Sequence, residues 1–96
     1  MAANELVAEW NTLTKRDMPA LARERDWPVH LDHCFQRILL DHAVGGYWKE
    51  TIASPAYRHA TDAQLGKAIA LGQDAIAGTA DMDALNRQSL KWRGKL

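Results

Sequence analysis

Apolar residues recur along the chain at the three- and four-residue spacing of amphipathic helices. The first predicted helix spans residues 5–13, and its apolar face is made of Leu6, Val7, Trp10 and Leu13. A second, short helix is expected to begin at Asp17, a common N-cap residue, with Pro19 in its first turn. It should end before Trp27-Pro28, because a residue that precedes proline is pushed out of helical geometry.

A central helix is predicted from the stretch HCFQRILLDHAVGGYW, residues 33–48. Asp32 is its expected N-cap, and Gly45 and Gly46 should end it after Val44. Stepping 100° per residue places one apolar face at Leu31, Phe35, Ile38 and Leu39. Leu40 and Val44 fall on the far side, so neighbours should cover this helix on more than one flank. Polar groups within it then need hydrogen-bond partners.

Helix-start and helix-stop signals divide the rest of the chain. SPAY, residues 54–57, predicts a helix start with the serine as cap and the proline at the first position. TDAQ, residues 61–64, is a capping-box pattern for a helix that Gly78 ends. The alanines and glycines of that helix should let a neighbour come close. Asp81 opens the last helix, which should reach about Trp92.

No alternating strand pattern, repeat or long linker interrupts these helices. We therefore predict an all-α fold, a compact single-domain bundle of about five helices with short loops, over residues 1–96. An apolar share of 47% is ordinary for a globular protein, and 96 residues can bury a core without disulfides or a structural metal.

The chain has 12 basic and 12 acidic residues, so its net charge is zero. Such a chain lacks the field of a general nucleic-acid binder and has little charge repulsion against forming a homodimer. A lone cysteine fits a reducing compartment. Neither a secretory signal pattern nor an apolar run of membrane-spanning length is present, so a cytoplasmic location without a membrane partner is expected.

Polar residues of the central helix are candidates for chemistry. Arg37 and Asp41 are four residues apart and can pair with each other. Cys34 lies on the same flank and is either a small buried hydrophobe or a thiol whose pKa Arg37 lowers. The second alternative is a Cys34-dependent enzyme or redox-responsive protein, and its candidate bases are His33, His42 and His59.

Four residues of types that bind metals are close in sequence: His30, His33, Cys34 and His42. On a helix His33 and His42 point in nearly opposite directions, and the spacing matches no zinc pattern. No metal site is therefore predicted.

The last helix turns polar groups inward beside an apolar arc of Met82, Leu85 and Trp92. Asn86, Ser89 and Arg93 fall in or beside this arc, at spacings of three and four. They either cap other helices or line a small polar pocket with Arg93 as an anion ligand. An inward guanidinium needs a counter-charge, and Asp41 is the expected one. Arg37 competes for it, so one carboxylate can serve two guanidiniums and leave net positive charge.

The C-terminal region has two features that could indicate nucleic-acid binding. Its basic residues could bind phosphate beside Trp92, but cations at a helix C-terminus are also what the helix dipole favours. In a helix-turn-helix arrangement the recognition helix would begin with Asp81 and Asp83, which repel phosphate. The sequence thus argues against sequence-specific DNA binding.

The segments HCFQRILLD, GGYW, SPAYRHA and SLKWRGKL resemble a group of short bacterial and fungal proteins, sometimes labelled as related to GCN5-type N-acetyltransferases. The resemblance runs from about Trp27 to Lys95. Acetyltransferases of that type hold coenzyme A on a Q/R-x-x-G-x-G/A loop after a strand. QLGKA, residues 64–68, has a different spacing and lies within a predicted helix, so no cofactor is predicted.

The preferred function is a small binding or interaction module rather than an enzyme. Its compact polar pocket would take a small anion or a segment of a partner protein. The pocket residues are expected to be Arg37, Asp41, Trp48, Asn86, Ser89 and Arg93.

Overall fold

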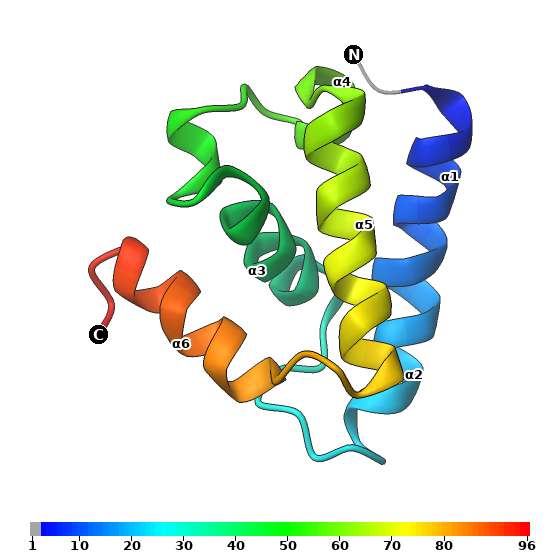
Figure 1. Ribbon diagram of the computed structural model, residues 1–96, viewed down its shortest axis with the longest axis vertical. Helices are drawn as coiled ribbons and strands as arrows, with labels where there is room; N and C mark the ends of the chain where they lie inside the picture. Colours follow the sequence, from blue (N-terminus) through cyan, green and yellow to red (C-terminus); the bar gives the residue numbers. More distant parts are fainter. Residues whose placement is uncertain (1–2) are drawn as a thin grey trace.

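The computed structural model describes residues 3–96, and this part of the chain is helical with no strand (Figure 1). The elements in chain order are α1 (Asn4–Thr12), the π-helical η1 (Leu13–Asp17), α2 (Met18–Ala22), α3 (Asp32–Val44), the 3₁₀ turn η2 (Trp48–Glu50), α4 (Ala56–His59), α5 (Asp62–Ala77) and α6 (Met82–Trp92). Because α1, η1 and α2 follow one another without a break, they count as one helix, and five helices result. The all-α prediction is confirmed.

The first two predicted helices are one continuous helix, so the break expected at Asp17 is wrong. Asp17 has helical dihedral angles and makes no capping hydrogen bond. The chain passes through η1, a π turn in which the Met18 N–H donates to the Leu13 carbonyl five residues earlier. Pro19 then stands in the first turn of α2, where a missing N–H is tolerated.

Helix α3 occupies the centre of the molecule, packed against α5 on one side and α6 on the other (Figure 1). Its N-cap is Leu31, one residue before the expected Asp32, whose carboxylate instead accepts a hydrogen bond from the His33 N–H at 2.7 Å. It ends as predicted at Gly45, which adopts a left-handed φ of 75°.

The predicted capping box of α5 is confirmed. The Thr61 hydroxyl accepts from the Gln64 N–H, and the Gln64 side chain accepts from the Thr61 N–H. Close helix approach is found at Gly72, where an added Cβ would lie 2.6 Å from Leu13 Cδ2. The absence of a side chain there lets α5 pack tightly on the first helix.

Of the two helices that flank α5, α4 begins one residue later than expected and α6 begins where it was predicted. The N-cap of α4 is Pro55, in extended geometry, rather than Ser54, and α4 is a separate four-residue helix before α5. Helix α6 begins as predicted, because the Asp81 carboxylate accepts from the Asp83 N–H at 2.9 Å.

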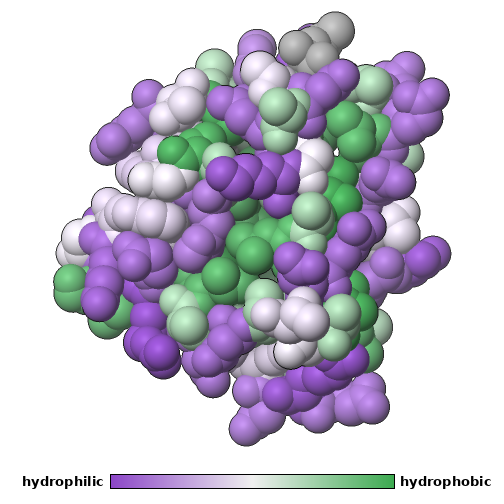
Figure 2. Space-filling model, viewed as in Figure 1, coloured by the Kyte–Doolittle hydropathy of each residue, from purple (hydrophilic) through white to green (hydrophobic). Residues whose placement is uncertain are grey.

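The core contains many of the large side chains that the sequence pattern placed on inner faces, but Leu31, expected on the apolar face of the central helix, is 49% exposed. The buried members of the core include Trp10, Leu13, Phe35, Ile38, Leu39, Leu65, Ile69 and Met82. The face in Figure 2 is largely polar, with apolar residues visible across its middle. Among the helices of residues 3–96, none combines the length and apolar character needed to cross a membrane. Within residues 3–96, three polar side chains are fully buried, Thr14, Asp41 and Ser89, and two of them meet in the candidate site.

Candidate functional site

The Asp41 carboxylate, fully buried in the last turns of α3, is the centre of a polar network. Oδ2 accepts from Ser89 Oγ at 2.6 Å and from Arg93 Nε at 2.8 Å. Oδ1 accepts from Arg93 Nη2 at 3.1 Å and from the Trp48 backbone N–H at 3.0 Å. A buried carboxylate is stable only when partners replace its lost water, and these four bonds do so. Asp41 therefore ties α3 to η2 and α6.

The expected ion pair between Arg93 and Asp41 is confirmed. Arg93 closes α6, and only 17% of its side chain is exposed. Both of its bonds to Asp41 come from one edge of the guanidinium, the bidentate geometry that suits a carboxylate. Its guanidinium carbon also lies 4.2 Å from the centre of the Tyr47 ring, a cation–π contact. These contacts fix Arg93 in one position.

Arg37 does not bond to Asp41, so the ion pair expected between them is wrong. Its Nη1 donates to Ser89 Oγ and its Nη2 to Asn86 Oδ1, both at 2.8 Å. The Ser89 hydroxyl stands between the guanidinium and the carboxylate, because it accepts from Arg37 and donates to Asp41. Arg37 is thereby held by two neutral side chains of α6.

The network carries more positive than negative charge, since it contains two guanidiniums and one carboxylate. The pKa of Arg37 is lowered from its ordinary value, first by burial and next by the nearby charge of Arg93. An anion beside these two guanidiniums would relieve that unfavourable environment.

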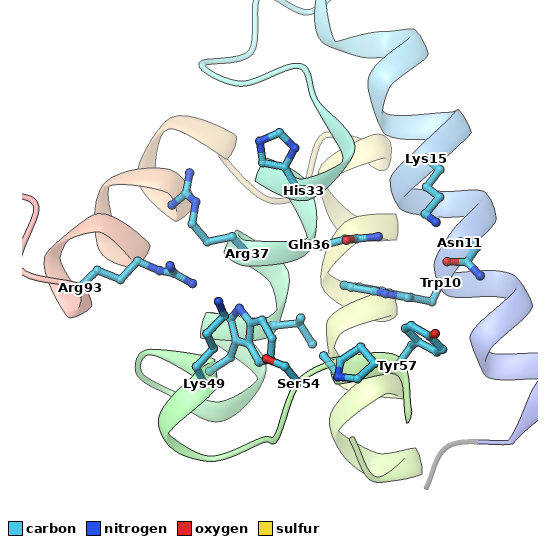
Figure 3. A pocket seen from close by; sticks show the side chains of 14 residues that line it. Trp10, Asn11, Lys15, His33, Gln36, Arg37, Lys49, Ser54, Tyr57 and Arg93 are labelled. Carbon is cyan, nitrogen blue, oxygen red and sulfur yellow. The ribbon is translucent and has the colours of Figure 1, made fainter. Parts of the chain in front are cut away.

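A cleft of about 770 Å³ opens in front of this network (Figure 3). It is bounded by α1 and η1, by α3, by the segment from η2 to α4, and by Arg93. Four cationic side chains line it: Lys15, Arg37, Lys49 and Arg93. Among the described residues that line it there is no Asp or Glu, in a chain with equal numbers of acids and bases.

Aromatic and apolar groups form much of the remaining wall, chiefly Trp10, Trp48, Pro55 and Tyr57. Trp10 is only 2% exposed, so it forms part of the floor, whereas Tyr57 is 46% exposed at the rim. In Figure 3, Trp10 and Tyr57 lie on the side of the cleft away from Arg37 and Arg93. The cleft thus offers both charge and apolar surface to a ligand.

The π turn η1 contributes to the same cleft. The Thr14 hydroxyl, fully buried, donates to the Trp10 carbonyl at 2.8 Å and accepts from Gln36 Nε2 at 3.0 Å. These bonds orient the Gln36 amide, which lies in the middle of the cleft wall in Figure 3. Single π turns within helices frequently occur at functional sites.

The six residues predicted for the pocket divide into two groups. Arg37, Trp48 and Arg93 line the cleft. Asp41, Asn86 and Ser89 stand behind it and hold the two arginines.

Sequence reasoning missed the contributions of the first helix and of the segment before α5, notably Trp10, Lys15, Lys49 and Tyr57. Trp10 was visible only as one more apolar residue of an amphipathic face. Only Lys49 had a short-range signal in the sequence, because it directly follows Trp48, a predicted pocket residue. In the structure its Nζ lies 5.6 Å from the centre of the Trp48 ring.

Cys34 lies half-buried outside the cleft lining. Of its candidate bases, His33 is exposed, lines the cleft and places Nδ1 3.5 Å from Asp32 Oδ1. His42 places Nε2 2.9 Å from the Leu85 carbonyl and packs edge-on against Trp92, while His59 is exposed. Within residues 3–96 no hydrogen bond joins Cys34 to a histidine, and no three metal-binding side chains gather. In this part of the chain Cys34 therefore has the Arg37 guanidinium beside it but no histidine bonded to it as a base.

Comparison with known protein families, with curated proteins and with solved structures finds no match to this chain. The resemblance seen in the sequence thus stays a prediction.

Proposed function

We propose that this protein is a small helical binding module whose cleft takes a small anionic ligand. The observation that carries the proposal is the set of four cations, Lys15, Arg37, Lys49 and Arg93, around one cleft whose lining has no carboxylate. They come from η1, α3, η2 and the end of α6, so the fold collects in one place charges that are far apart in the sequence.

The charge argument depends on where the counter-charges are. Asp41 neutralises Arg93 from behind, whereas Arg37 is held by the neutral groups of Asn86 and Ser89. A ligand carboxylate or phosphate in the cleft would meet a guanidinium whose charge no bonded carboxylate offsets. Hydrogen bonds between such ionised groups are about twice as strong as neutral ones.

The size of the cleft agrees with a small-molecule ligand. Small-molecule sites are typically concave, about 300–1,000 Å³, with an apolar lining and a few placed polar groups. A cleft of about 770 Å³ with fixed arginines and a tryptophan floor fits that description. We place this module in the cytoplasm, in keeping with its single cysteine.

Titration calorimetry of the full chain with sodium phosphate, and separately with 2-naphthoate, tests the proposal. At least one of these anions should bind, and more weakly as salt is raised. Lys15→Ala combined with Lys49→Ala should weaken that binding about tenfold, because two cations of the cleft are lost. Both lysines are exposed, so the variant should fold.

The matched control is Lys67→Ala, which removes an exposed cation of α5 that does not line the cleft. Its dissociation constants should stay within about twofold of the unmodified protein. The proposal is wrong if neither anion binds, or if the double variant and the control bind equally well.

A further inference from the structure

The cleft has two chemically different ends. At one end Arg37 and Arg93 are locked by the Asp41 network, with Lys49 beside them in Figure 3. At the other end stand the indole of Trp10 and the ring of Tyr57, with Lys15 above them. A ligand that fills the cleft therefore meets guanidiniums with one part and aromatic surface with the other.

The Trp10 ring adds a directional feature to the aromatic end. Every buried polar side-chain atom in residues 3–96 has a hydrogen-bond partner. The indole N–H of Trp10 donates to no acceptor in this part of the chain, so it must reach accessible space. Trp10 lines the cleft, which is where this N–H can meet a ligand.

We propose that the ligand class is an aryl carboxylate, with its carboxylate against Arg37 and Arg93 and its ring against Trp10 and Tyr57. This inference rests on the proposed function and makes it specific, by naming the body of the ligand and its direction in the cleft. A planar ring suits this end, because aromatic groups contact one another edge-on or offset-stacked at favourable energy.

Two simpler ligand classes fit less well. A bare inorganic anion would satisfy Arg37 but leave the exposed side chains of Pro55 and Tyr57 facing water, so their apolar area would contribute nothing to binding. A neutral aromatic compound would cover that area and leave the Arg37 charge without a partner. An aryl carboxylate serves both ends at once. Asp41 offsets one of the two guanidinium charges of Arg37 and Arg93, so the ligand carboxylate can offset the other.

Titration calorimetry with a matched set of probes tests the inference: 2-naphthoate, acetate as the headgroup alone, and 2-naphthamide as the neutral isostere. We expect 2-naphthoate to bind at least about tenfold more tightly than either of the others, because only it uses both ends. Tyr57→Ala should weaken 2-naphthoate about fivefold and leave acetate unchanged, since it removes a ring at the aromatic end.

Leu31→Ala is the control for loss of an exposed apolar side chain, because Leu31 is 49% exposed and lies outside the cleft lining. It should leave all three constants unchanged. If acetate or phosphate binds as tightly as 2-naphthoate, and Tyr57→Ala has no effect, the ligand class is wrong while anion binding stands. If 2-naphthamide matches 2-naphthoate, charge does not select the ligand and the inference fails. If none of these anions binds, the proposed function fails with it.

Discussion

Asp41 and Arg93 form a bidentate ion pair across 52 positions of sequence, with Arg93 Nε 2.8 Å from Oδ2 and Nη2 3.1 Å from Oδ1. The pair joins the buried interior of α3 to the end of α6. Through Ser89 the same carboxylate reaches Arg37, so one fully buried acid positions both guanidiniums of the cleft. The cleft and the stability of the fold therefore depend on the same group.

Replacing Asp41 tests its role directly. Asp41→Asn keeps the shape of the side chain but leaves the Arg93 guanidinium without a counter-charge. Breaking a buried pair by changing one partner typically costs about 3–5 kcal/mol, so the free energy of unfolding should fall by about 3 kcal/mol. Urea denaturation followed by circular dichroism measures it. A loss below about 0.5 kcal/mol, the range of surface changes, would contradict the burial of this pair.

Arg93→Ala should lower the free energy of unfolding by a few kcal/mol, about as much as Asp41→Asn, because Asp41 is then buried without its charged partner. Lys95→Ala is the matched control, since it removes an exposed cation two residues away. The control should stay within about 0.5 kcal/mol of the unmodified protein. Equal behaviour of the two variants would show that Arg93 is a solvated C-terminal cation instead.

Replacement by alanine should change the stability in opposite directions at two glycines of α5, Gly72 and Gly66. Gly72→Ala would place a Cβ 2.6 Å from Leu13 Cδ2 and 3.1 Å from Leu39 Cδ1, both in the core. Overpacking costs about 1–3 kcal/mol, more than the roughly 1 kcal/mol that alanine gains in a helix, so a net loss of about 1 kcal/mol is expected. Gly66→Ala meets no neighbour and should instead raise the stability by about 0.5–1 kcal/mol. Thermal unfolding of both variants measures these changes in stability. A stabilising Gly72→Ala would disprove the close packing of α5 on the first helix.

Cys34 should matter little to binding, because it lies outside the cleft lining and because Ser89 and Asn86 hold the Arg37 guanidinium that it contacts. Cys34→Ala is expected to cost on the order of 1 kcal/mol of stability, as deletion of a small group does, and to leave the dissociation constant for 2-naphthoate unchanged. A thiol reagent should also label the folded protein more slowly than the unfolded chain. Rapid labelling near neutral pH, with loss of binding, would favour the Cys34-dependent alternative over the binding module.

Local signals in the sequence were sufficient for most of the helix boundaries. The Thr61–Gln64 capping box, the glycine stops at Gly45 and Gly78, and the Asp81 cap each act within one turn, so four or five residues determine them. Asp17 failed as a start signal because the π turn η1 carries the helix past it to Pro19. Nothing in a helical repeat of apolar residues indicates a π turn.

The candidate site was predictable only where two buried helices had to satisfy each other. A guanidinium and a carboxylate on inner faces need partners, and from this requirement the Arg93–Asp41 pair follows. Whether Arg37 pairs with Asp41 or with Ser89 depends on side-chain positions of about an ångström, which spacing does not determine. Lys15 and Tyr57 enter the cleft through the packing of separate elements, and no short-range pattern brings them together.

The four tryptophans offer the most direct test of the central claim, that the cleft binds an organic anion. Each indole N–H gives its own signal in a ¹H–¹⁵N correlation spectrum, so a titration with 2-naphthoate reports on four places at once. Trp10 and Trp48 line the cleft, whereas Trp27 packs against Phe35 and Trp92 against His42 outside the lining. The account predicts saturable shifts of the Trp10 and Trp48 indole signals, with those of Trp27 and Trp92 nearly unchanged. Unchanged Trp10 and Trp48 signals, or shifts confined to Trp27 and Trp92, would contradict it.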